Sequence, residues 1–276
     1  MALDALTLDL ISMALSEDIG PGDVTSALIP ADSQGQAHLV AKEPLVLAGT
    51  EAFVEVFAQV DDASEVEFTA SEGEEITEGQ SFANIAGLTR SILSSERVAL
   101  NILQHMCGIA THARRCAEAV KPHAAKVVDT RKTLPGLRAL EKYAVRVGGG
   151  HNHRFGLFDG VLIKDNHIAA MGSITEAINA ARKAAHHLLK IECEVTSIRE
   201  FNEAREAGAD VILLDNMTLS ELEIAVTQNH SRALLEASGN VTLERLPDIA
   251  ATGVDLISMG SLTHSVKAAD ISLRWK

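Results

Sequence analysis

The stretch "GVLIKDNHIAAMGSITEAINAARKAAHHLLKIECEV", residues 160–195, decides the fold class. It begins and ends with short apolar runs, and the helical stretch "SITEAINAARKAAHHL" lies between them. A strand, a helix and a second strand in this order form a βα unit, whose strands lie parallel and buried. The stretch therefore predicts an α/β protein built on a parallel sheet.

The same rhythm continues on both sides of this stretch. Apolar runs occur at residues 126–132, 160–166, 189–195, 210–216, 233–240 and 255–261. Helical stretches separate the later runs, and this repeated unit favours a closed barrel over an open sheet. No G-x-G-x-x-G sequence follows the first run, which weakens a dinucleotide-binding fold.

The part of the chain before residue 125 has a different sequence pattern. Residues 37–87 hold short extended runs punctuated by glycine, with a helix-like run at 50–60. This pattern predicts a small α+β layer. Residues 90–120 read as helical, and we expect a break in that helix near Gly108.

Polar side chains follow each apolar run of the predicted barrel. They are Asp129-Thr-Arg131-Lys132, Lys164-Asp165-Asn166, Glu192 with Glu194, Asp215-Asn216, Glu236-Ala-Ser238-Gly239 and Ser258-Met-Gly260-Ser261. The carboxyl ends of barrel strands form one rim, and active sites of such barrels lie at that rim. The sequence therefore predicts an active site there.

The charge distribution indicates an anionic substrate. The chain has a formal net charge of -14, which argues against general nucleic-acid binding. Residues 129–167 nevertheless hold seven Lys or Arg against four Asp or Glu. Arginine binds carboxylate or phosphate with two parallel hydrogen bonds, and lysine supplies a movable charge. A cationic pocket in an acidic protein favours a small anion.

The three cysteines, Cys107, Cys116 and Cys193, form no C-x-x-C pair, so the sequence indicates neither a disulfide framework nor a zinc knuckle. No stretch approaches the length of a membrane span, and the first ten residues have no basic segment typical of a signal peptide. We therefore expect a reduced, cytoplasmic location without membrane contact.

Two further sets of rim residues suggest their ligands. Glu194 and Asp215 end consecutive strands, where two carboxylates suit Mg²⁺, a sugar diol or positive charge that develops on a ribose carbon. Structural pairing of these acids with Lys164 or Lys190 is the alternative. Glycine and serine after the last two strands favour phosphate binding by backbone N–H groups.

His151 and His153 form an H-x-H pair, which binds metal in some barrel hydrolases. The pair precedes its strand rather than following it, so it lies on the wrong side of the sheet for that role. We expect His153 to contact an anion or to stabilise the turn, with Gly148–Gly150 giving the loop its backbone freedom.

Long blocks of the chain resemble the quinolinate phosphoribosyltransferases, also called nicotinate-nucleotide pyrophosphorylases (carboxylating). The blocks are "ALSEDIGPGDVTS" (14–26), "SSERVALNILQHMCGIAT" (94–111), "DTRKTLPGLRALEKYAVRVGGGHNHRFGLFDGVLIKDNHI" (129–168), "ECEV" (192–195), "LLDN" (213–216), "EASGNV" (236–241) and "SMGSLTHS" (258–265). They span nearly the whole chain in order, so the resemblance is specific.

The resemblance implies an N-terminal α+β open-faced sandwich, residues 1–108, and an incomplete TIM-like α/β barrel, residues 109–265. It also implies that residues 266–276 pack back on the first domain. The family forms homodimers with shared active sites, and Arg97 would reach the site of the partner subunit. Whether dimers assemble further stays open.

The resemblance also implies roles for the rim residues. Lys132, Lys164, Glu194 and Asp215 match catalytic positions, and Glu194 and Asp215 would contact Mg²⁺, directly or through water. The positions that would bind substrate are Arg97, Thr130, Arg131, Lys132, His153, Arg154, Lys164, Glu194, Asp215, Ser238, Gly239, Asn240, Gly260 and Ser261. The chain departs from the family at Leu134, Cys193 and Ser261, and none of these changes removes a charge.

The implied reaction is phosphoribosyl transfer from phosphoribosyl pyrophosphate to quinolinate with loss of CO₂ (EC 2.4.2.19), a step of NAD biosynthesis. It yields nicotinate mononucleotide and needs Mg²⁺ but no organic cofactor. The alternatives are a related transferase that acts on nicotinate or another anionic base, a non-catalytic protein that binds anionic metabolites, and a metal-dependent barrel hydrolase. Intact carboxylates at Glu194 and Asp215 argue against a pure anion receptor.

Overall fold

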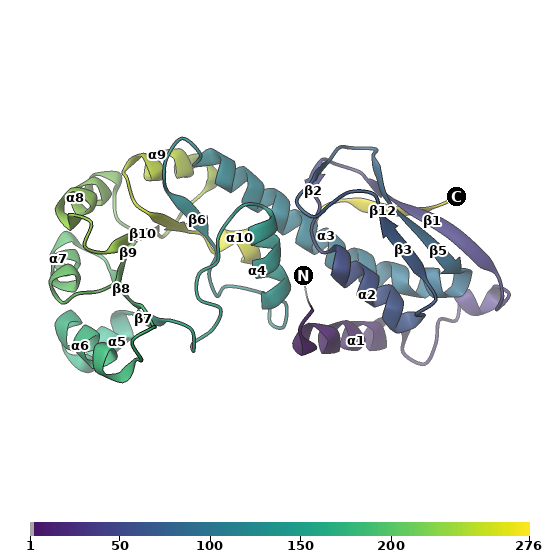
Figure 1. The fold of residues 1–276 in the computed structure, drawn as a ribbon, viewed down its shortest axis with the longest axis horizontal. Helices are drawn as coiled ribbons and strands as arrows, with labels where there is room; N and C mark the ends of the chain where they lie inside the picture. Colours follow the sequence, from purple (N-terminus) through teal and green to yellow (C-terminus); the bar gives the residue numbers. More distant parts are fainter. Residues whose placement is uncertain (1–2) are drawn as a thin grey trace. The chain divides into compact units, whose positions relative to one another are not determined.

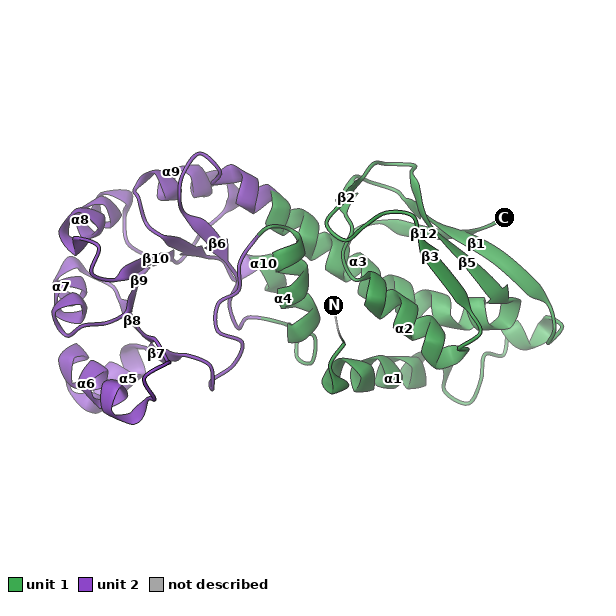
Figure 2. Cartoon of the chain, viewed as in Figure 1, with its two compact units in different colours: residues 1–114, 133–149, 262–276 green, residues 115–132, 150–261 purple. Residues whose placement is uncertain are grey.

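The computed structural model describes residues 3–276 and divides the chain into two compact units (Figures 1 and 2). The first unit holds residues 1–114, 133–149 and 262–276, and the second holds residues 115–132 and 150–261. The α/β class with an N-terminal antiparallel sheet and a C-terminal parallel sheet is confirmed. No helix among residues 3–276 is long and apolar enough to cross a membrane.

The first unit is built on a four-stranded sheet in the order β12-β1-β5-β3, in which neighbouring strands run antiparallel. Its strands are β1 (Gln34–Ala41), β3 (Glu65–Phe68), β5 (Ser81–Leu88) and β12 (Ile271–Trp275), and a separate pair joins β2 (Leu45–Val46) to β4 (Glu75–Ile76). The helices of this unit are α1 (Ala5–Ile19), η1 (Ser26–Leu28), α2 (Thr50–Val60) and α4 (Arg138–Val147). Two more helices cross a unit boundary: α3 (Thr89–Ala119) ends in the second unit, and α10 (Ser261–His264) begins at its last residue.

The predicted break near Gly108 is wrong, because α3 runs without interruption from Thr89 to Ala119. Gly108 serves packing instead. A Cβ atom at this position would lie 2.3 Å from the backbone oxygen of Lys267, so only glycine lets the two backbones approach so closely.

The second unit is a six-stranded sheet in the order β6-β11-β10-β9-β8-β7, in which all neighbours run parallel. Every apolar run that the sequence analysis singled out became one of its strands. They are β6 (Lys126–Val128), β7 (Val161–Ile163), β8 (Ile191–Val195), β9 (Val211–Asp215), β10 (Leu234–Ser238) and β11 (Leu256–Ser258). Among residues 3–276, no pairing joins the edge strands β6 and β7, so the barrel is incomplete rather than closed.

Helices cover the outer side of this sheet (Figure 1). They are α5 (Asp165–Met171), α6 (Ile174–Ala184), α7 (Ile198–Glu206), α8 (Leu219–Asn229), η2 (Leu243–Arg245) and α9 (Leu246–Ala251). Three of them begin with the same local sequence: Ser173, Ser197 and Thr218 each accept a hydrogen bond from the backbone of the glutamate three residues later. This cap begins each helix at a defined residue: Ser197 and Thr218 follow strands β8 and β9, whereas Ser173 follows helix α5.

Candidate active site

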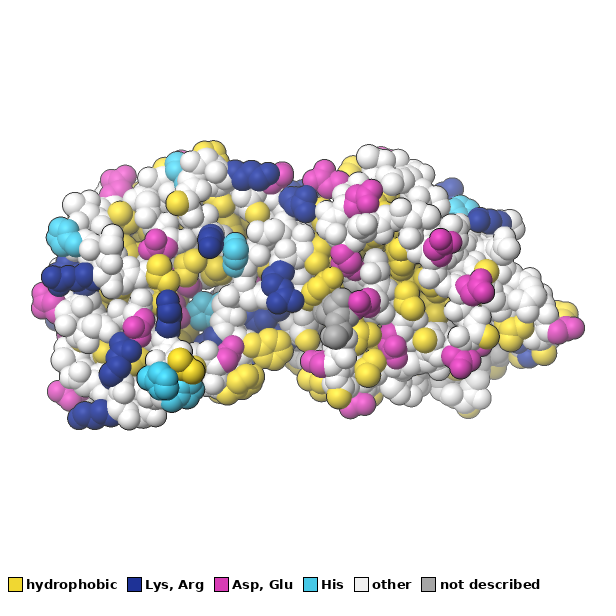
Figure 3. All heavy atoms as spheres, in the orientation of Figure 1, with side chains coloured by type: hydrophobic (Ala, Val, Ile, Leu, Met, Phe, Trp, Pro, Cys, Tyr) yellow, Lys and Arg dark blue, Asp and Glu magenta, His cyan; other side chains and the backbone are white. Residues whose placement is uncertain are grey.

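The strand register places the polar rim side chains on one face of the parallel sheet. Glu192 pairs with Val211 and Glu194 with Leu213, while Ser238 pairs with Asp215. Side chains alternate between faces along a strand, and paired neighbours share a face. Glu194, Asp215 and Ser238 therefore project to the same side as Glu192, which is the interior of the incomplete barrel. Figure 3 shows Lys, Arg and His side chains around the hollowed centre of this unit.

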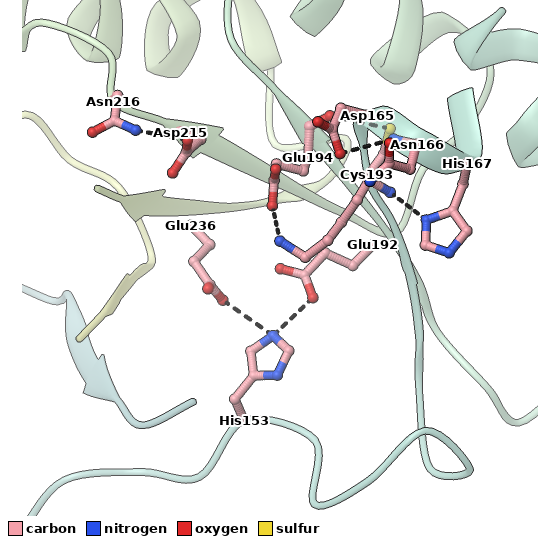
Figure 4. Close-up of polar contacts among 11 residues, drawn as sticks. His153, Asp165, Asn166, His167, Glu192, Cys193, Glu194, Asp215, Asn216 and Glu236 are labelled. Carbon is pink, nitrogen blue, oxygen red and sulfur yellow. Dashed lines mark hydrogen bonds and ion pairs between the residues drawn. The ribbon is translucent and has the colours of Figure 1, made fainter. Parts of the chain in front are cut away.

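Lys164 lies at the end of β7 and forms an ion pair with Glu194 at the end of β8 (Figure 4). The side chain of Lys164 is 45% exposed and that of Glu194 is 17% exposed, so solvent reaches the pair. An exposed pair of this kind adds little to stability. It keeps a cation and a carboxylate together at the mouth of the barrel.

Asp215 belongs to a cluster formed by the ends of β9 and β10. Its carboxylate accepts a hydrogen bond from Asn216 Nδ2 at 2.7 Å, and Asn240 Nδ2 donates to Asn216 Oδ1 at 3.0 Å. The backbone nitrogen of Asn216 donates a hydrogen bond to the backbone carbonyl oxygen of Ser238 at 2.9 Å. Gly239 has φ +93°, and a Cβ there would lie 2.2 Å from Asn216 Oδ1, so the two loops meet only because this residue is glycine.

The cationic residues come from the end of β6 and from the loop before β7. Arg131 and Lys132 are exposed, and the Lys132 backbone donates to Thr130 Oγ1 at 3.0 Å. Arg154 is half-buried and donates to the Gly160 backbone oxygen at 2.9 Å. Burial, and next the positive charge of Arg131, lower the pKa of Arg154. Both causes disfavour the charged form of Arg154, and a bound anion would favour it.

His153 lies among carboxylates of the barrel interior. Its Nε2 atom is 2.8 Å from Glu192 Oε2 and 3.9 Å from Glu236 Oε2 (Figure 4). The expectation that the H-x-H pair lies on the wrong side of the sheet is wrong for His153. His151 forms a parallel bridge with Val128 of β6, and this pairing carries His153 to the rim.

Three further residues of the expected site are Arg97, Gly260 and Ser261. Arg97 is exposed on α3 and belongs to the first unit. Gly260 and Ser261 follow β11 in the second unit, and Ser261 begins the short helix α10.

Sequence reasoning left several polar residues of the site without a role. They are Asp129, Asn152, Glu192, Asn216 and Glu236. The signal for the two glutamates is the alternation of side chains along a strand, since Glu192 lies two residues before Glu194 and Glu236 lies two residues before Ser238. Asp129 follows the first apolar run and was therefore expected at the rim, but its contact with Asn152 has no local signal, because it joins segments that are distant in the sequence.

Family models cover almost the entire chain. The model described as "Quinolinate phosphoribosyl transferase, N-terminal domain" matches residues 23–107, and the model of the C-terminal domain matches residues 109–274. The chain belongs to the quinolinate phosphoribosyltransferase family. The resemblance carried by the sequence blocks is thereby confirmed.

Individual members of the quinolinate phosphoribosyltransferase family are similar to this chain over nearly all of its residues. A probable nicotinate-nucleotide pyrophosphorylase (carboxylating) of Bacillus subtilis is 45% identical, and the match covers 96% of this chain and 91% of that protein. A quinolinate phosphoribosyltransferase (decarboxylating) of Nicotiana tabacum is 44% identical over 96% of this chain and 81% of that protein. The solved nicotinate-nucleotide pyrophosphorylase of Francisella tularensis superposes with a TM-score of 0.97 at 37% identity and covers 100% of this chain and 98% of that one.

Two carboxylates of the rim have the chemistry to hold the divalent metal ion that the sequence resemblance implies. Glu194 and Asp215 are half-buried carboxylates on adjacent strands and share one face of the sheet. Carboxylate oxygens suit Mg²⁺, which usually keeps several of its waters in protein sites. Because Lys164 and Asn216 already contact these carboxylates, a metal held through water fits better than a fully coordinated one.

Proposed function

We propose that the rim of the parallel-sheet unit binds quinolinate and phosphoribosyl pyrophosphate and carries out the reaction of the family. That activity is quinolinate phosphoribosyl transfer in NAD biosynthesis (EC 2.4.2.19). One observation supports this assignment of the site most strongly: Lys164, Glu194 and Asp215 project from adjacent strand ends, and Lys164 forms an ion pair with Glu194.

Quinolinate carries two adjacent carboxylates, and the rim has enough cationic residues to bind both. Arg131 and Arg154 would hold them, since a charge-assisted hydrogen bond to a carboxylate is about twice as strong as a neutral one. Lys132, His153 and Lys164 add further cationic or donor groups, and Thr130 holds the backbone of Lys132. The resting partner of Lys164 is Glu194, so the lysine has a nearby anion both with and without substrate.

Transfer breaks the bond between the ribose carbon and pyrophosphate, and the pyridine nitrogen forms the new bond. Glu194 and Asp215 stabilise the positive charge that develops on the ribose carbon. Neutralisation of the charge on departing pyrophosphate is the chemistry that Mg²⁺ supplies when bound. The 5′-phosphate is assigned to the loops after β10 and β11, that is, to Ser238, Gly239, Asn240, Gly260 and Ser261.

Decarboxylation follows from the transfer itself. Once the ring nitrogen carries ribose it is cationic, so it stabilises the electron pair left at C2 when the bond to CO₂ breaks. A proton then adds to C2 and gives nicotinate mononucleotide. No organic cofactor is needed, and the contribution of the residues is positioning and electrostatics.

The proposed assembly is a homodimer with shared active sites, supported by family membership and by the exposed position of Arg97 on α3. It is tested by mixing Arg97→Ala protein with Lys164→Ala protein, each inactive alone. Heterodimers with one intact site should recover part of the activity. No recovery, with subunit exchange verified by mass spectrometry, contradicts the shared site.

The same proposal includes a domain boundary and a cellular location. The domain boundary at residue 108 places the family's substrate-binding positions other than Arg97 in one domain of residues 109–265. The cytoplasmic location rests on the three cysteines, which form no C-x-x-C pair and no disulfide framework.

The substrate is tested by supplying phosphoribosyl pyrophosphate and Mg²⁺ with quinolinate in one reaction and nicotinate in another. Product formed from quinolinate only supports the clamp for two carboxylates. Product formed from nicotinate only would keep ribosyl transfer but overturn that clamp. Absence of product in both, from folded protein, would favour a protein that binds anionic metabolites.

A further inference from the structure

The imidazole ring of His153 lies between two glutamates that are almost completely buried. Glu192 is 6% exposed and Glu236 is 1% exposed, and both lie on inner strands of the parallel sheet. His153 Nε2 is 2.8 Å from Glu192 Oε2 and 3.9 Å from Glu236 Oε2. These are the carboxyl groups nearest the ring in Figure 4, and both are reached by the same nitrogen atom.

The backbone of His153 is also fixed. The buried carboxylate of Asp129 accepts a hydrogen bond of 2.9 Å from the His153 backbone nitrogen, and it accepts another of 2.6 Å from Asn152 Nδ2. His151 exchanges two backbone hydrogen bonds with the β6 segment, at 2.9 Å and 3.0 Å. The ring therefore enters the barrel from a segment that is held on both sides of Asn152.

Two carboxyl groups so close together and so far from water need a hydrogen-bond donor. Burial, and next the charge of Glu192, raise the pKa of Glu236 to about 7. One oxygen of each glutamate, Oε1, makes no hydrogen bond within residues 3–276. The 2.8 Å contact holds one hydrogen between His153 Nε2 and Glu192 Oε2, and with that hydrogen on Nε2 the Glu192 carboxylate is the acceptor.

We propose that Glu192 and Glu236 are positioning residues for His153: Glu192 accepts a hydrogen bond from Nε2, and Glu236 lies 3.9 Å from the same nitrogen, so that together they hold the ring in one orientation, with a hydrogen on Nε2, before an anionic substrate binds. The inference rests on the proposed function in one respect, because His153 is there assigned to substrate binding. It goes further by giving a task to two buried acids that touch no substrate in the proposed reaction.

The task explains why acids occupy these positions. Buried acids are costly, and apolar residues of similar volume are often neutral or stabilising replacements for buried ion pairs. Neighbouring positions on the same face, such as Leu213 and Leu256, are apolar. A ring that is already oriented avoids the cost of ordering it during binding. The two buried acids thus lower the stability of the barrel, and in return the ring of His153 is already oriented when substrate binds.

The first test reads the ring directly in the ligand-free protein. ¹⁵N-labelled histidine distinguishes a hydrogen-bearing ring nitrogen from a bare one, and His153→Gln assigns the signal. The prediction is that Nε2 of His153 bears hydrogen in the wild type, and that Glu192→Met gives a mixture of the two neutral forms. A bare Nε2 in the wild type would overturn the proposal, even if every variant failed to fold.

The chain contains a matched internal control. His105 Nε2 lies 2.9 Å from Glu141 Oε1, and Glu141 is completely buried. Glu192→Met should leave the signal of His105 unchanged, whereas Glu141→Met should change His105 and not His153. A change in both signals with one substitution would mean that the variants alter the fold as a whole, and would overturn the specific assignment.

The second test separates positioning from a structural role. Glu192→Met should raise the KM for quinolinate by at least about tenfold, with a smaller change in kcat and in the KM for phosphoribosyl pyrophosphate. Glu192→Gln keeps an oxygen acceptor and should restore most of the affinity. Equal effects on both KM values, or a tightly bound transition metal at the three residues, would overturn the proposal. A wild type that is inactive but keeps hydrogen on Nε2 would instead contradict the proposed function.

Discussion

Asp129 and His153 are joined by a hydrogen bond of 2.9 Å between the buried carboxylate of the first and the backbone nitrogen of the second. They lie 24 residues apart, at the end of β6 and in the loop before β7. Since β6 and β7 are the two edges of the parallel sheet, this bond helps to hold a segment that the sheet itself does not hold. It places a histidine among the strand ends of the rim.

Replacing Asp129 with alanine should therefore loosen the site and the fold together. The change removes the acceptor of the bonds from His153 N and Asn152 Nδ2, and we expect a loss of about 1–3 kcal/mol in the free energy of unfolding. Urea denaturation measures this loss. Asp129→Asn keeps one acceptor oxygen and should lose less. Wild-type stability of the alanine variant would show that the bond is dispensable.

Lys164→Met should abolish most activity without destabilising the protein. The ion pair with Glu194 is exposed, so its removal should cost no more than about 1 kcal/mol. Activity should fall at least about a hundredfold, because the substrate loses a charged partner and Glu194 loses its cation. Arg182→Met is the control, since Arg182 pairs with Asp210 at 2.9 Å on the surface of the same unit. Similar activities of the two variants would contradict the role of Lys164.

Gly239→Ala should weaken the binding of phosphoribosyl pyrophosphate. Its Cβ would lie 2.2 Å from Asn216 Oδ1, so the loops after β9 and β10 must separate. Gly172 has the same φ of +93° but open space around it. Gly172→Ala should therefore show only the backbone cost of about 1–2 kcal/mol, with an unchanged KM. The account fails here if both variants have the same KM for phosphoribosyl pyrophosphate.

Glu236 should make the stability of the protein depend on pH below neutrality. Burial raises the pKa of this carboxyl to about 7, from 4.5 in the absence of such effects. Between these values the folded protein binds more protons than the unfolded chain, so the contribution of Glu236 is largest below pH 4.5, falls as the pH rises, and is lost above about pH 7. Denaturant titrations from pH 5 to 8 should show a slope that Glu236→Gln reduces. Parallel curves for both proteins would contradict the assignment.

The strands were readable from the sequence because each is a short apolar run that ends in polar residues. The run "DVILLDN" shows both features, and β9 ends at Asp215 as expected. The same alternation places Glu192 and Glu194 on one face, although only Glu194 was assigned a role from the sequence. Local periodicity thus predicts which strands and faces exist.

Contacts between distant segments were not readable in this way. The position of His153 depends on the isolated bridge between His151 and Val128. These two residues are 23 positions apart in the sequence, and no local pattern predicts such a pairing. Gly108 was interpreted as a helix break because glycine is a poor helix former, yet it lies inside α3 where the backbone near Lys267 comes close. In both cases tertiary packing overrides the local signal.

The most direct test of the central claim uses quinolinate that carries ¹³C in the carboxylate at C2. Purified protein, phosphoribosyl pyrophosphate and Mg²⁺ should release labelled CO₂ and pyrophosphate in equal amounts, together with unlabelled nicotinate mononucleotide. Glu194→Gln, assayed in parallel, should lower the rates of both releases equally, because ribosyl transfer precedes loss of CO₂. Pyrophosphate released without labelled CO₂, or no turnover of quinolinate by folded protein, would contradict the account.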